Sequence, residues 1–269
     1  MNGPSPLHQN YERVLARIER ACEAAGRPPA SVRLLAVSKT FPAADVLALA
    51  ALGQRAFGEN YVQEALDKIS ACHDERSQAG SGTGNHARAG AGDRDAPLEW
   101  HFIGPIQSNK TRPIAEHFDW VHSVDREKIA RRLADQRPEA RGPLQVCVQV
   151  NVSGEASKSG VEPADALALA QVCAALPSLR LRGLTAIPEP TDDVALQRHR
   201  FAELRRLHER IRSELAPDAA RHFDTLSMGM SADLESAIAE GATIVRIGTA
   251  LFGNRPGKPG RPGSDHGYA

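Results

Sequence analysis

Eight short apolar runs, rich in β-branched residues, alternate along the chain with longer stretches of helical periodicity. The runs that predict strands are residues 32–38, 55–58, 99–104, 119–124, 144–152, 181–187, 223–229 and 243–248. Alternating strands and helices are typical of a parallel sheet, because each helix returns the chain to the edge where the previous strand began. Eight such units within 269 residues predict one α/β domain, a TIM (β/α)8 barrel.

An extra helix is expected before the first strand. Residues 8–25 place Leu15, Ile18 and Cys22 at helical spacing among charged residues, and Gly26 follows directly. This pattern predicts an amphipathic N-terminal helix that ends near the glycine.

Two segments lack apolar periodicity. Residues 73–97 are rich in Gly, Ala, Ser and charge, and we interpret them as a flexible insertion between the second and third βα units. Residues 254–269 have the same character with more proline, which predicts a disordered C-terminal tail. The barrel is therefore expected within residues 1–253.

Charge and cysteine spacing exclude several classes of protein. The 33 Lys and Arg residues balance 33 Asp and Glu residues, so no global field favours nucleic acid, although a local basic pocket could hold a phosphate-sized ligand. The four cysteines show no C-x-x-C spacing, which argues against a metal site or a disulfide framework. No export signal and no apolar run near 18 residues is visible, so we expect a cytoplasmic protein without a membrane span.

Unusual polar and small residues gather where the predicted strands end. In a TIM barrel these ends share one face, and active sites lie on that face. The candidate binding residues there are Lys39, Asn60, Ser227, Met228, Gly229, Arg246, Gly248 and Thr249.

Lys39 directly follows the first apolar strand. Partial removal from water favours the neutral amine, which can attack a carbonyl group. Alternatively, the lysine only marks the point where the strand reaches solvent.

The loops after the seventh and eighth strands predict an anion site, because phosphate sites recur there in TIM barrels. Gly229 and Gly248 allow close backbone approach, and we place a phosphate at Gly248 and Thr249 with help from Ser227. Each glycine is also explained as a turn residue. Ser231 is a plausible N-cap of the helix that follows.

Arg246 lies inside an apolar strand, where a guanidinium group needs a partner. The alternatives are an ion pair within the barrel and a hydrogen bond to the ring nitrogen of a bound cofactor. Three other residues have a structural alternative to a functional role: Asn60 as a loop-forming residue, His122 as a core histidine and Met228 as a packing residue.

These residues stand in long motifs that resemble the pyridoxal 5′-phosphate (PLP) homeostasis protein family, small PLP-binding barrels related to the N-terminal domain of alanine racemase. The resemblance covers roughly residues 8–253 apart from the insertion. The motifs are LLAVSKT, FGENYVQEA, WHFIGPIQSNK, VHSVD, VQVNVSGEASKSG, FDTLSMGMSADLESAI and ATIVRIGTALFG.

The resemblance implies that PLP is the cofactor and that Lys39 holds it as a covalent aldimine. It also implies that Ser227, Gly248 and Thr249 help to hold the phosphate, and that Arg246 faces the pyridine nitrogen.

Two positions depart from the family pattern. Pro105 stands where members commonly have His, and Thr185 stands where Met is usual. Neither change affects the lysine or the phosphate loops.

The resemblance predicts a protein that buffers or carries PLP and supports intracellular vitamin B6 and amino-acid homeostasis without catalysis. Alanine racemase uses two bases, and its second base is a tyrosine from an additional domain. Tyr11, Tyr61 and Tyr268 are the only tyrosines here, and none is suitably placed. An arginine at the pyridine nitrogen would also weaken the electron sink on which PLP chemistry depends.

Two other functions remain open. One is a weak PLP-dependent amino-acid racemase, and the other is a barrel whose insertion and tail recruit a partner while PLP acts as a sensor ligand. We expect a monomer whose partners are PLP and apo forms of PLP-dependent enzymes, with neither nucleic acid nor a membrane among them.

Overall fold

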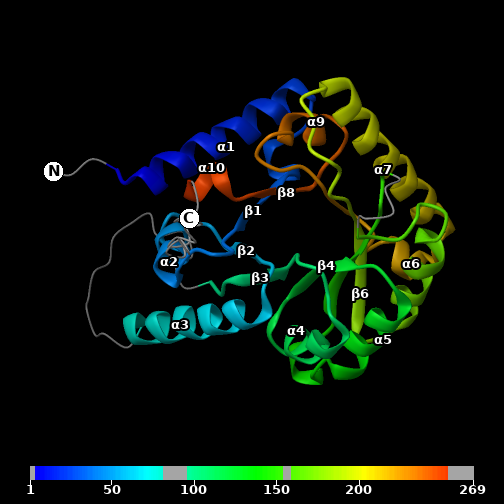
Figure 1. The fold of residues 1–269 in the computed structure, drawn as a ribbon, viewed down its shortest axis with the longest axis horizontal. Helices are drawn as coiled ribbons and strands as arrows, with labels where there is room; N and C mark the ends of the chain where they lie inside the picture. Colours follow the sequence, from blue (N-terminus) through cyan, green and yellow to red (C-terminus); the bar gives the residue numbers. More distant parts are fainter. Residues whose placement is uncertain (1–3, 81–95, 154–158, 254–269) are drawn as a thin grey trace, which may run out of the picture.

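Eight parallel strands close into a barrel in which each strand pairs with its neighbours in chain order, as the alternation predicted (Figure 1). The computed structural model describes residues 4–80, 96–153 and 159–253. Pairing of β1 with β8, from Arg33 opposite Ile244 to Ala36 opposite Ile247, closes the barrel. The strands are β1 (Arg33–Val37), β2 (Ala56–Glu59), β3 (Glu99–Phe102), β4 (Trp120–Val124), β5 (Leu144–Gln149), β6 (Leu179–Thr185), β7 (Thr225–Ser227) and β8 (Ile244–Ile247).

Helices connect the strands and surround the barrel (Figure 1). The α-helices are α1 (Pro6–Ala24), α2 (Ala43–Ala51), α3 (Val62–Gly80), α4 (Thr111–His117), α5 (Glu127–Gln136), α6 (Ala166–Ala175), α7 (Val194–Glu214), α8 (Pro217–Ala220), α9 (Leu234–Ala239) and α10 (Thr249–Phe252). Short 3-10 turns lie at Pro29–Ser31, Ser108–Lys110 and Glu139–Arg141.

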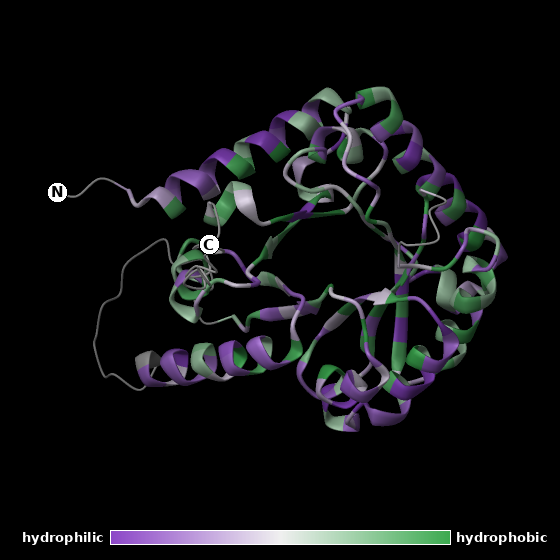
Figure 2. Ribbon diagram, viewed as in Figure 1, coloured by the Kyte–Doolittle hydropathy of each residue, from purple (hydrophilic) through white to green (hydrophobic). Residues whose placement is uncertain are grey.

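The core lies between the strands and the surrounding helices. Every residue of β4 is buried, and so is every residue of β8. Strands covered on both faces read as nearly continuous apolar runs, which is why the sequence showed runs rather than strict alternation. Figure 2 shows apolar colouring along much of the barrel, and alternating polar and apolar segments along the surrounding helices.

Helix α1 begins where local sequence favours a start. The Ser5 hydroxyl accepts a hydrogen bond from the backbone N–H of His8 at 3.2 Å, and Pro6 occupies the first turn. A serine cap followed by proline is a common helix start. The helix ends at Ala24, and Gly26 then adopts a positive φ of 63°.

The buried face of α1 contains Ile18 and Cys22 of the predicted apolar positions but not Leu15. Tyr11, Val14, Ile18 and Cys22 are buried, whereas Leu15 is 40% exposed. Successive helical residues differ by about 100° around the axis, so burial of Val14 turns the next side chain toward solvent.

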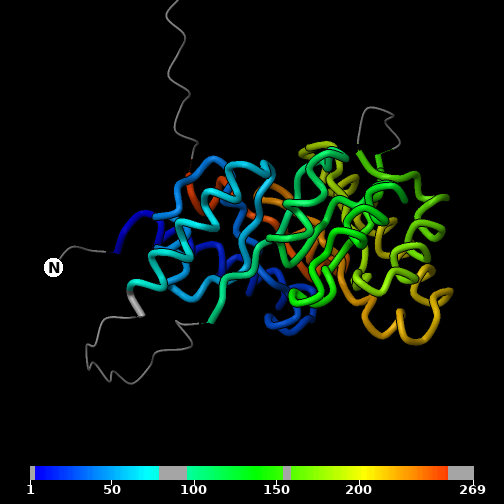
Figure 3. The backbone as a smooth tube through the Cα atoms, turned by 90° about the horizontal axis from the view of Figure 1, so that it is seen from below, coloured from blue at the N-terminus to red at the C-terminus, as the bar shows by residue number. Residues whose placement is uncertain are grey.

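Helix α1 braces the elements that follow β7 and β8. The Asn10 side chain donates to the carbonyl oxygen of Leu251 at 2.8 Å, and Arg17 pairs with Glu235 at 2.6 Å. Figures 1 and 3 show the blue first helix close to the orange and red segments from the end of the chain. The loops after the last two strands are therefore supported from outside the barrel.

The predicted start of the insertion, residue 73, is wrong, because α3 extends beyond it. The helix continues to Gly80, so residues 73–80, which were expected to be flexible, are helical. Extending an existing helix fixes one residue per added hydrogen bond, and this stretch contains no proline. The Arg76 side chain also donates to the carbonyl oxygen of Ala96 at 2.6 Å. Residues 81–95 of the predicted insertion and the predicted tail at 254–269 lie outside the described residues.

All four cysteines are buried and unpaired with one another. Within the described ranges, no set of three or more His, Cys, Asp or Glu side chains is grouped to hold a metal ion. No helix in that part of the chain is both long and apolar enough to cross a membrane.

Candidate functional site

A cavity of about 340 Å³ lies at the carboxyl-terminal end of the barrel. Most of its lining residues lie at or just beyond the ends of β1, β2, β3, β6, β7 and β8. The lining residues are Val37, Lys39, Phe41, Asn60, Ile103, Ile187, Met230, Ser231, Ala232, Arg246, Gly248, Thr249 and Gly253. This is the face on which TIM barrels place their sites.

The cavity contains five of the eight predicted binding residues. They are Lys39, Asn60, Arg246, Gly248 and Thr249. The other three are not in the lining: they are Ser227, Met228 and Gly229. Met230 and Ser231, which come next in the chain, are in it instead.

The structural alternatives explain two of the residues outside the lining. Met228 is fully buried in the hydrophobic core. Gly229 has a φ of +93°, and a Cβ atom there would lie 2.5 Å from the Cβ of Ala237 in α9. Glycine is therefore needed at this position for the backbone conformation and for packing of α9 against the loop after β7.

Ser231 does not cap α9, contrary to the sequence prediction. The N-cap residue is Asp233, and its carboxylate accepts a hydrogen bond from the Met230 backbone N–H at 2.6 Å. The Ser231 carbonyl oxygen accepts from Arg17 at 3.0 Å. The helix starts two residues later than the serine would place it, which leaves Ser231 at the cavity.

The residue before Lys39 is held from two directions. The Ser38 hydroxyl donates to Glu59 Oε1 at 2.6 Å, and Lys68 Nζ donates to the Ser38 carbonyl oxygen at 2.7 Å. Lys68 also lies 2.7 Å from Glu59 Oε1. Burial raises the pKa of the Glu59 carboxyl, and the Lys68 ammonium opposes that rise. A hydrogen-bonded buried cluster thus fixes the backbone at the end of β1.

The residue after Lys39 is held as well. Thr40 has a φ of +69°, a conformation that costs energy for a β-branched residue. Its backbone N–H donates to Glu64 Oε1 at 2.5 Å, and the same carboxylate lies 3.0 Å from Lys68 Nζ. One lysine of α3 therefore connects the contacts on both sides of Lys39.

An aromatic pair joins the loops after β1 and β8. The rings of Phe41 and Phe252 stack with centroids 4.7 Å apart and planes 20° apart. Stacking of this kind adds about 0.5–1.5 kcal/mol to the burial of the rings. It holds α10, which begins at Thr249, beside the loop that carries Lys39.

Arg246 reaches the cavity from inside β8 and is 5% exposed. Its Nη2 donates to the Ala186 carbonyl oxygen at 2.8 Å, and its Nη1 donates to Thr185 Oγ1 at 3.1 Å and to the Ser227 carbonyl oxygen at 2.5 Å. Burial lowers the pKa of the guanidinium to about 10, and the Asp233 carboxylate opposes the change. The group therefore stays cationic at neutral pH.

Of the two alternatives for Arg246, the ion pair within the barrel is not found. Among the described residues, no carboxylate lies within ion-pair distance of its guanidinium, and its hydrogen bonds go to neutral oxygen atoms. The charge of Arg246 is thus not neutralised by a direct protein contact at the cavity.

Lys39 and Arg246 are the cationic residues of the lining, and no Asp or Glu of the described residues lines the cavity. The Asn60 side-chain oxygen is buried and has no hydrogen-bond partner in the structure. Such a lining suits a ligand that carries negative charge and polar groups.

A larger hollow of about 830 Å³ lies outside the barrel and is lined partly by α2, α3 and β3. It contains none of the predicted binding residues. Its basic side chains already make structural contacts, since Arg141 pairs with Asp119 at 3.0 Å and Arg76 binds the Ala96 carbonyl. The smaller cavity at the strand ends is therefore the candidate site.

Sequence reasoning missed the groups that hold Lys39 and Arg246. Glu64 and Lys68 stand at i, i+4 spacing, which favours an ion pair on one helix face, but their contact with the Lys39 loop depends on how α3 packs. Arg246 donates to the Ser227 hydroxyl, which lies 2.8 Å from His122 Nδ1, and His122 lies 2.8 Å from His101. His101 and Glu99 point to the same side of β3 because one residue separates them. That alternation was the available signal.

Known proteins resemble this chain in sequence and in fold. Residues 10–256 match the family described as "Alanine racemase, N-terminal domain". The chain is 58% identical to the pyridoxal phosphate homeostasis protein of Pseudomonas aeruginosa, over 93% of this chain and 96% of that protein. It is 50% identical to the protein of the same name from Vibrio cholerae, over 93% and 96% of the two chains.

A solved relative is PipY from Synechococcus elongatus, whose structure was determined with PLP bound. It is 36% identical, with a TM-score of 0.69, over 88% of this chain and 99% of that one. The barrel is thus of the alanine racemase N-terminal class. Within that class, the chain belongs to the pyridoxal phosphate homeostasis protein family.

Proposed function

We propose that this protein binds PLP in the cavity at the carboxyl ends of the strands, and that it buffers or carries the cofactor. The observation that supports this most is the lining itself, which combines an amine, Lys39, with a buried guanidinium, Arg246, and no carboxylate among the described residues. The PLP-bound structure of PipY supports the same ligand class.

The residues present fit PLP group by group. The cofactor is an anion with a phosphate, a phenolic oxygen and a ring nitrogen, and the lining offers cationic and hydroxyl groups. Asn60 also lines the cavity, and its buried side-chain oxygen, an acceptor, lacks a hydrogen-bond partner. At Gly248, a Cβ atom would be in ordinary van der Waals contact with Val37, at 3.4–3.8 Å, so packing alone does not require glycine there.

When bound, PLP supplies an aldehyde that condenses reversibly with amines. Lys39 Nζ would hold the aldehyde carbon, because it is the primary amine of the lining. Thr249 and the backbone at Gly248 would hold the phosphate, with Ser231 in place of the predicted Ser227. Arg246 would face the ring nitrogen.

A carrier suits the lining better than a racemase does. Racemisation needs a second acid–base group opposite the lysine, and the described residues that line the cavity include no His, Tyr, Cys, Asp or Glu. Tyr61 is 56% exposed and lies outside the lining. Apo forms of PLP-dependent enzymes are the proposed recipients of the cofactor.

The test is a titration of cofactor-free protein with PLP, followed by absorbance in the near ultraviolet and visible range. We expect a new band that saturates at one PLP per chain. Pyridoxine 5′-phosphate, which has the phosphate and ring but no aldehyde, should compete for the cavity without producing the band. A spectrum equal to the sum of protein and free PLP at every ratio would contradict the proposal.

A further inference from the structure

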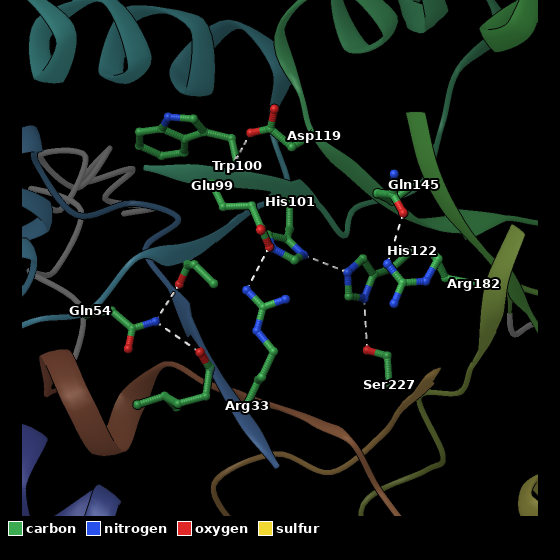
Figure 4. Close-up of polar contacts among 12 residues, drawn as sticks. Arg33, Gln54, Glu99, Trp100, His101, Asp119, His122, Gln145, Arg182 and Ser227 are labelled. Atoms are coloured by element: carbon green, nitrogen blue, oxygen red, sulfur yellow. Dashed lines mark hydrogen bonds and ion pairs between the residues drawn. The ribbon is translucent and has the colours of Figure 1, made fainter. Parts of the chain in front are cut away.

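A chain of hydrogen-bonded polar side chains, three of them buried, runs through the barrel interior (Figure 4). Glu99 Oε1 lies 2.5 Å from His101 Nε2, and His101 Nδ1 lies 2.8 Å from His122 Nε2. His122 Nδ1 lies 2.8 Å from Ser227 Oγ. We call Glu99, His101, His122 and Ser227 the polar column.

The column ends at a charged group on each side. Arg246 Nη1 donates to Ser227 Oγ at 2.8 Å, at the carboxyl-terminal end of the barrel. Arg33 Nη2 donates to Glu99 Oε1 at 2.8 Å, near the amino-terminal end. The column therefore connects the Glu99 carboxylate, which is 32% exposed at the amino-terminal end of the barrel, with the Arg246 guanidinium that lines the cavity.

The interior position makes the column unusual. TIM barrel interiors are filled mainly by branched apolar side chains, yet His101, His122 and Ser227 are at most 1% exposed. Buried polar groups are costly unless each finds a partner. No side-chain atom of the column is among the unpartnered buried atoms of the described residues. A fully hydrogen-bonded network of this kind specifies one arrangement of its members.

The direction of the hydrogen bonds follows from the two ends. A guanidinium only donates and a carboxylate only accepts. With neutral imidazoles, Arg246 donates to Ser227, and the Ser227 hydroxyl donates to His122 Nδ1. His122 Nε2–H then donates to His101 Nδ1, and His101 Nε2–H donates to Glu99. Every link has one hydrogen, and both histidines are Nε2–H tautomers.

The surroundings favour these neutral forms. Burial lowers the pKa of His101, although Glu99 opposes the shift. Burial, then His101 and Arg246, lower the pKa of His122 well below its usual value. The pKa of Glu99 falls to about 2, with His101 and Arg33 favouring its charged form against the effect of burial.

We propose that the polar column positions Arg246 for the cofactor ring, with Ser227 as the residue that transmits its effect. The proposal rests on the proposed function. Because the Ser227 hydrogen is directed to His122, the hydroxyl oxygen presents a lone pair to Arg246 Nη1. Without that fixed acceptor, Arg246 Nη1 keeps only the Thr185 hydroxyl and the Ser227 carbonyl oxygen as partners, and the guanidinium is held less firmly in one orientation. Ser227 is therefore a positioning residue and not a phosphate ligand.

The column can be tested without ligand by nitrogen NMR of histidine-labelled protein at pH 7. The His101 and His122 signals, assigned by single substitutions, should be those of neutral Nε2–H tautomers. A protonated ring, or an Nδ1–H tautomer at either residue, would overturn the hydrogen-bond order on which the proposal depends.

The role toward the cofactor is tested by affinity for two ligands, PLP and its carbocyclic analogue in which C–H replaces the ring nitrogen. His122→Phe keeps a ring in place but removes both nitrogens. This variant should bind PLP about 10-fold more weakly, because the hydrogen bond between the Arg246 guanidinium and the ring nitrogen is weakened. It should bind the analogue as the wild type does.

The matched control is His208→Phe. His208 is also a buried histidine, but it stacks on Phe223 at 4.4 Å and lies outside the column. This variant should bind both ligands normally. A parallel loss of both ligands in His122→Phe, or no loss of either, would overturn the positioning role. Failure of the wild type to bind PLP would instead overturn the proposed function and, with it, the column's role toward the cofactor.

Discussion

The ammonium group of Lys68 lies 2.7 Å from the carbonyl oxygen of Ser38, the residue directly before Lys39. The same ammonium contacts Glu59 and Glu64, and Glu64 accepts from the backbone N–H of Thr40. A side chain of α3 thus sets the path of the loop that presents the proposed PLP-binding amine.

Replacing Lys68 with Met should strongly destabilise the protein. The change leaves Glu59, which is fully buried, without its cationic partner, and breaking a buried ion pair costs about 3–5 kcal/mol. The loss is measured as the decrease in the free energy of unfolding in urea, monitored by circular dichroism. The double variant Lys68→Met, Glu59→Gln should recover part of it, because the uncompensated charge is then absent.

An exposed ion pair provides the control for this prediction. Arg131 and Glu127 lie 2.6 Å apart, with side chains 56% and 54% exposed. Arg131→Met should cost less than about 1 kcal/mol. Equal losses of stability for Lys68→Met and Arg131→Met would show that the Lys68 cluster contributes no more to stability than a surface ion pair does.

The phosphate position can be separated from the rest of the site by Thr249→Ala. Loss of one hydrogen bond to a charged group is worth about 1.5–3 kcal/mol, so the dissociation constant for PLP should rise about 10- to 150-fold. Pyridoxal, which lacks the phosphate, should bind the variant and the wild type almost equally in equilibrium titrations. If both ligands weaken in parallel, Thr249 does not contact the phosphate.

Stability should fall as the pH decreases from about 6.5 to about 4. Burial, followed by the charge of Arg212, lowers the pKa of His208 to about 4. The unfolded chain then binds more protons than the folded protein in this window. The neutral histidine contributes fully above the unfolded pKa, and this contribution, about 3 kcal/mol, is lost as the pH falls to the folded pKa.

His208→Phe isolates this effect, because phenylalanine can stack on Phe223 without titrating. The free energy of unfolding of the variant, measured in urea at several pH values, should depend less steeply on pH between 6.5 and 4. Superimposable slopes for variant and wild type would assign the acid sensitivity to other groups.

Exchange at the α-carbon of free amino acids should be slow. The described lining offers Lys39 but no second acid–base side chain, and one such group contributes about 10²- to 10⁴-fold to rate. Deuterium incorporation into L-alanine in heavy water, with Lys39→Ala as the blank, measures this activity. A rate of about 1 s⁻¹ or faster, within the usual enzymatic range, would favour the racemase alternative.

The sequence predicted the barrel well because its evidence is local. Each β-branched run and each helical period shows its own element, and the order of elements defines the topology. The extent of α3 beyond residue 73 was missed, since a polar stretch without apolar periodicity carries no signal for helix continuation.

The site was predicted only in part, because strand ends locate residues to within a few positions. Lys39, Arg246 and Thr249 reach the cavity as expected. Ser227 lies close in sequence to the lining residue Met230, but its hydroxyl contacts His122 and Arg246 and does not line the cavity. The direction of that side chain depends on histidines from β3 and β4, and neither appears as a partner in any local pattern.

The central claim is that Lys39 binds PLP covalently in this cavity. The most direct measurement is borohydride reduction of the PLP-loaded protein, followed by proteolysis and mass spectrometry of the peptides. The claim predicts one stoichiometric adduct, on the peptide that contains Lys39, and its absence from Lys39→Ala. Modification spread over surface lysines, or a stoichiometric adduct at Lys68 or Lys110 in place of Lys39, would contradict it.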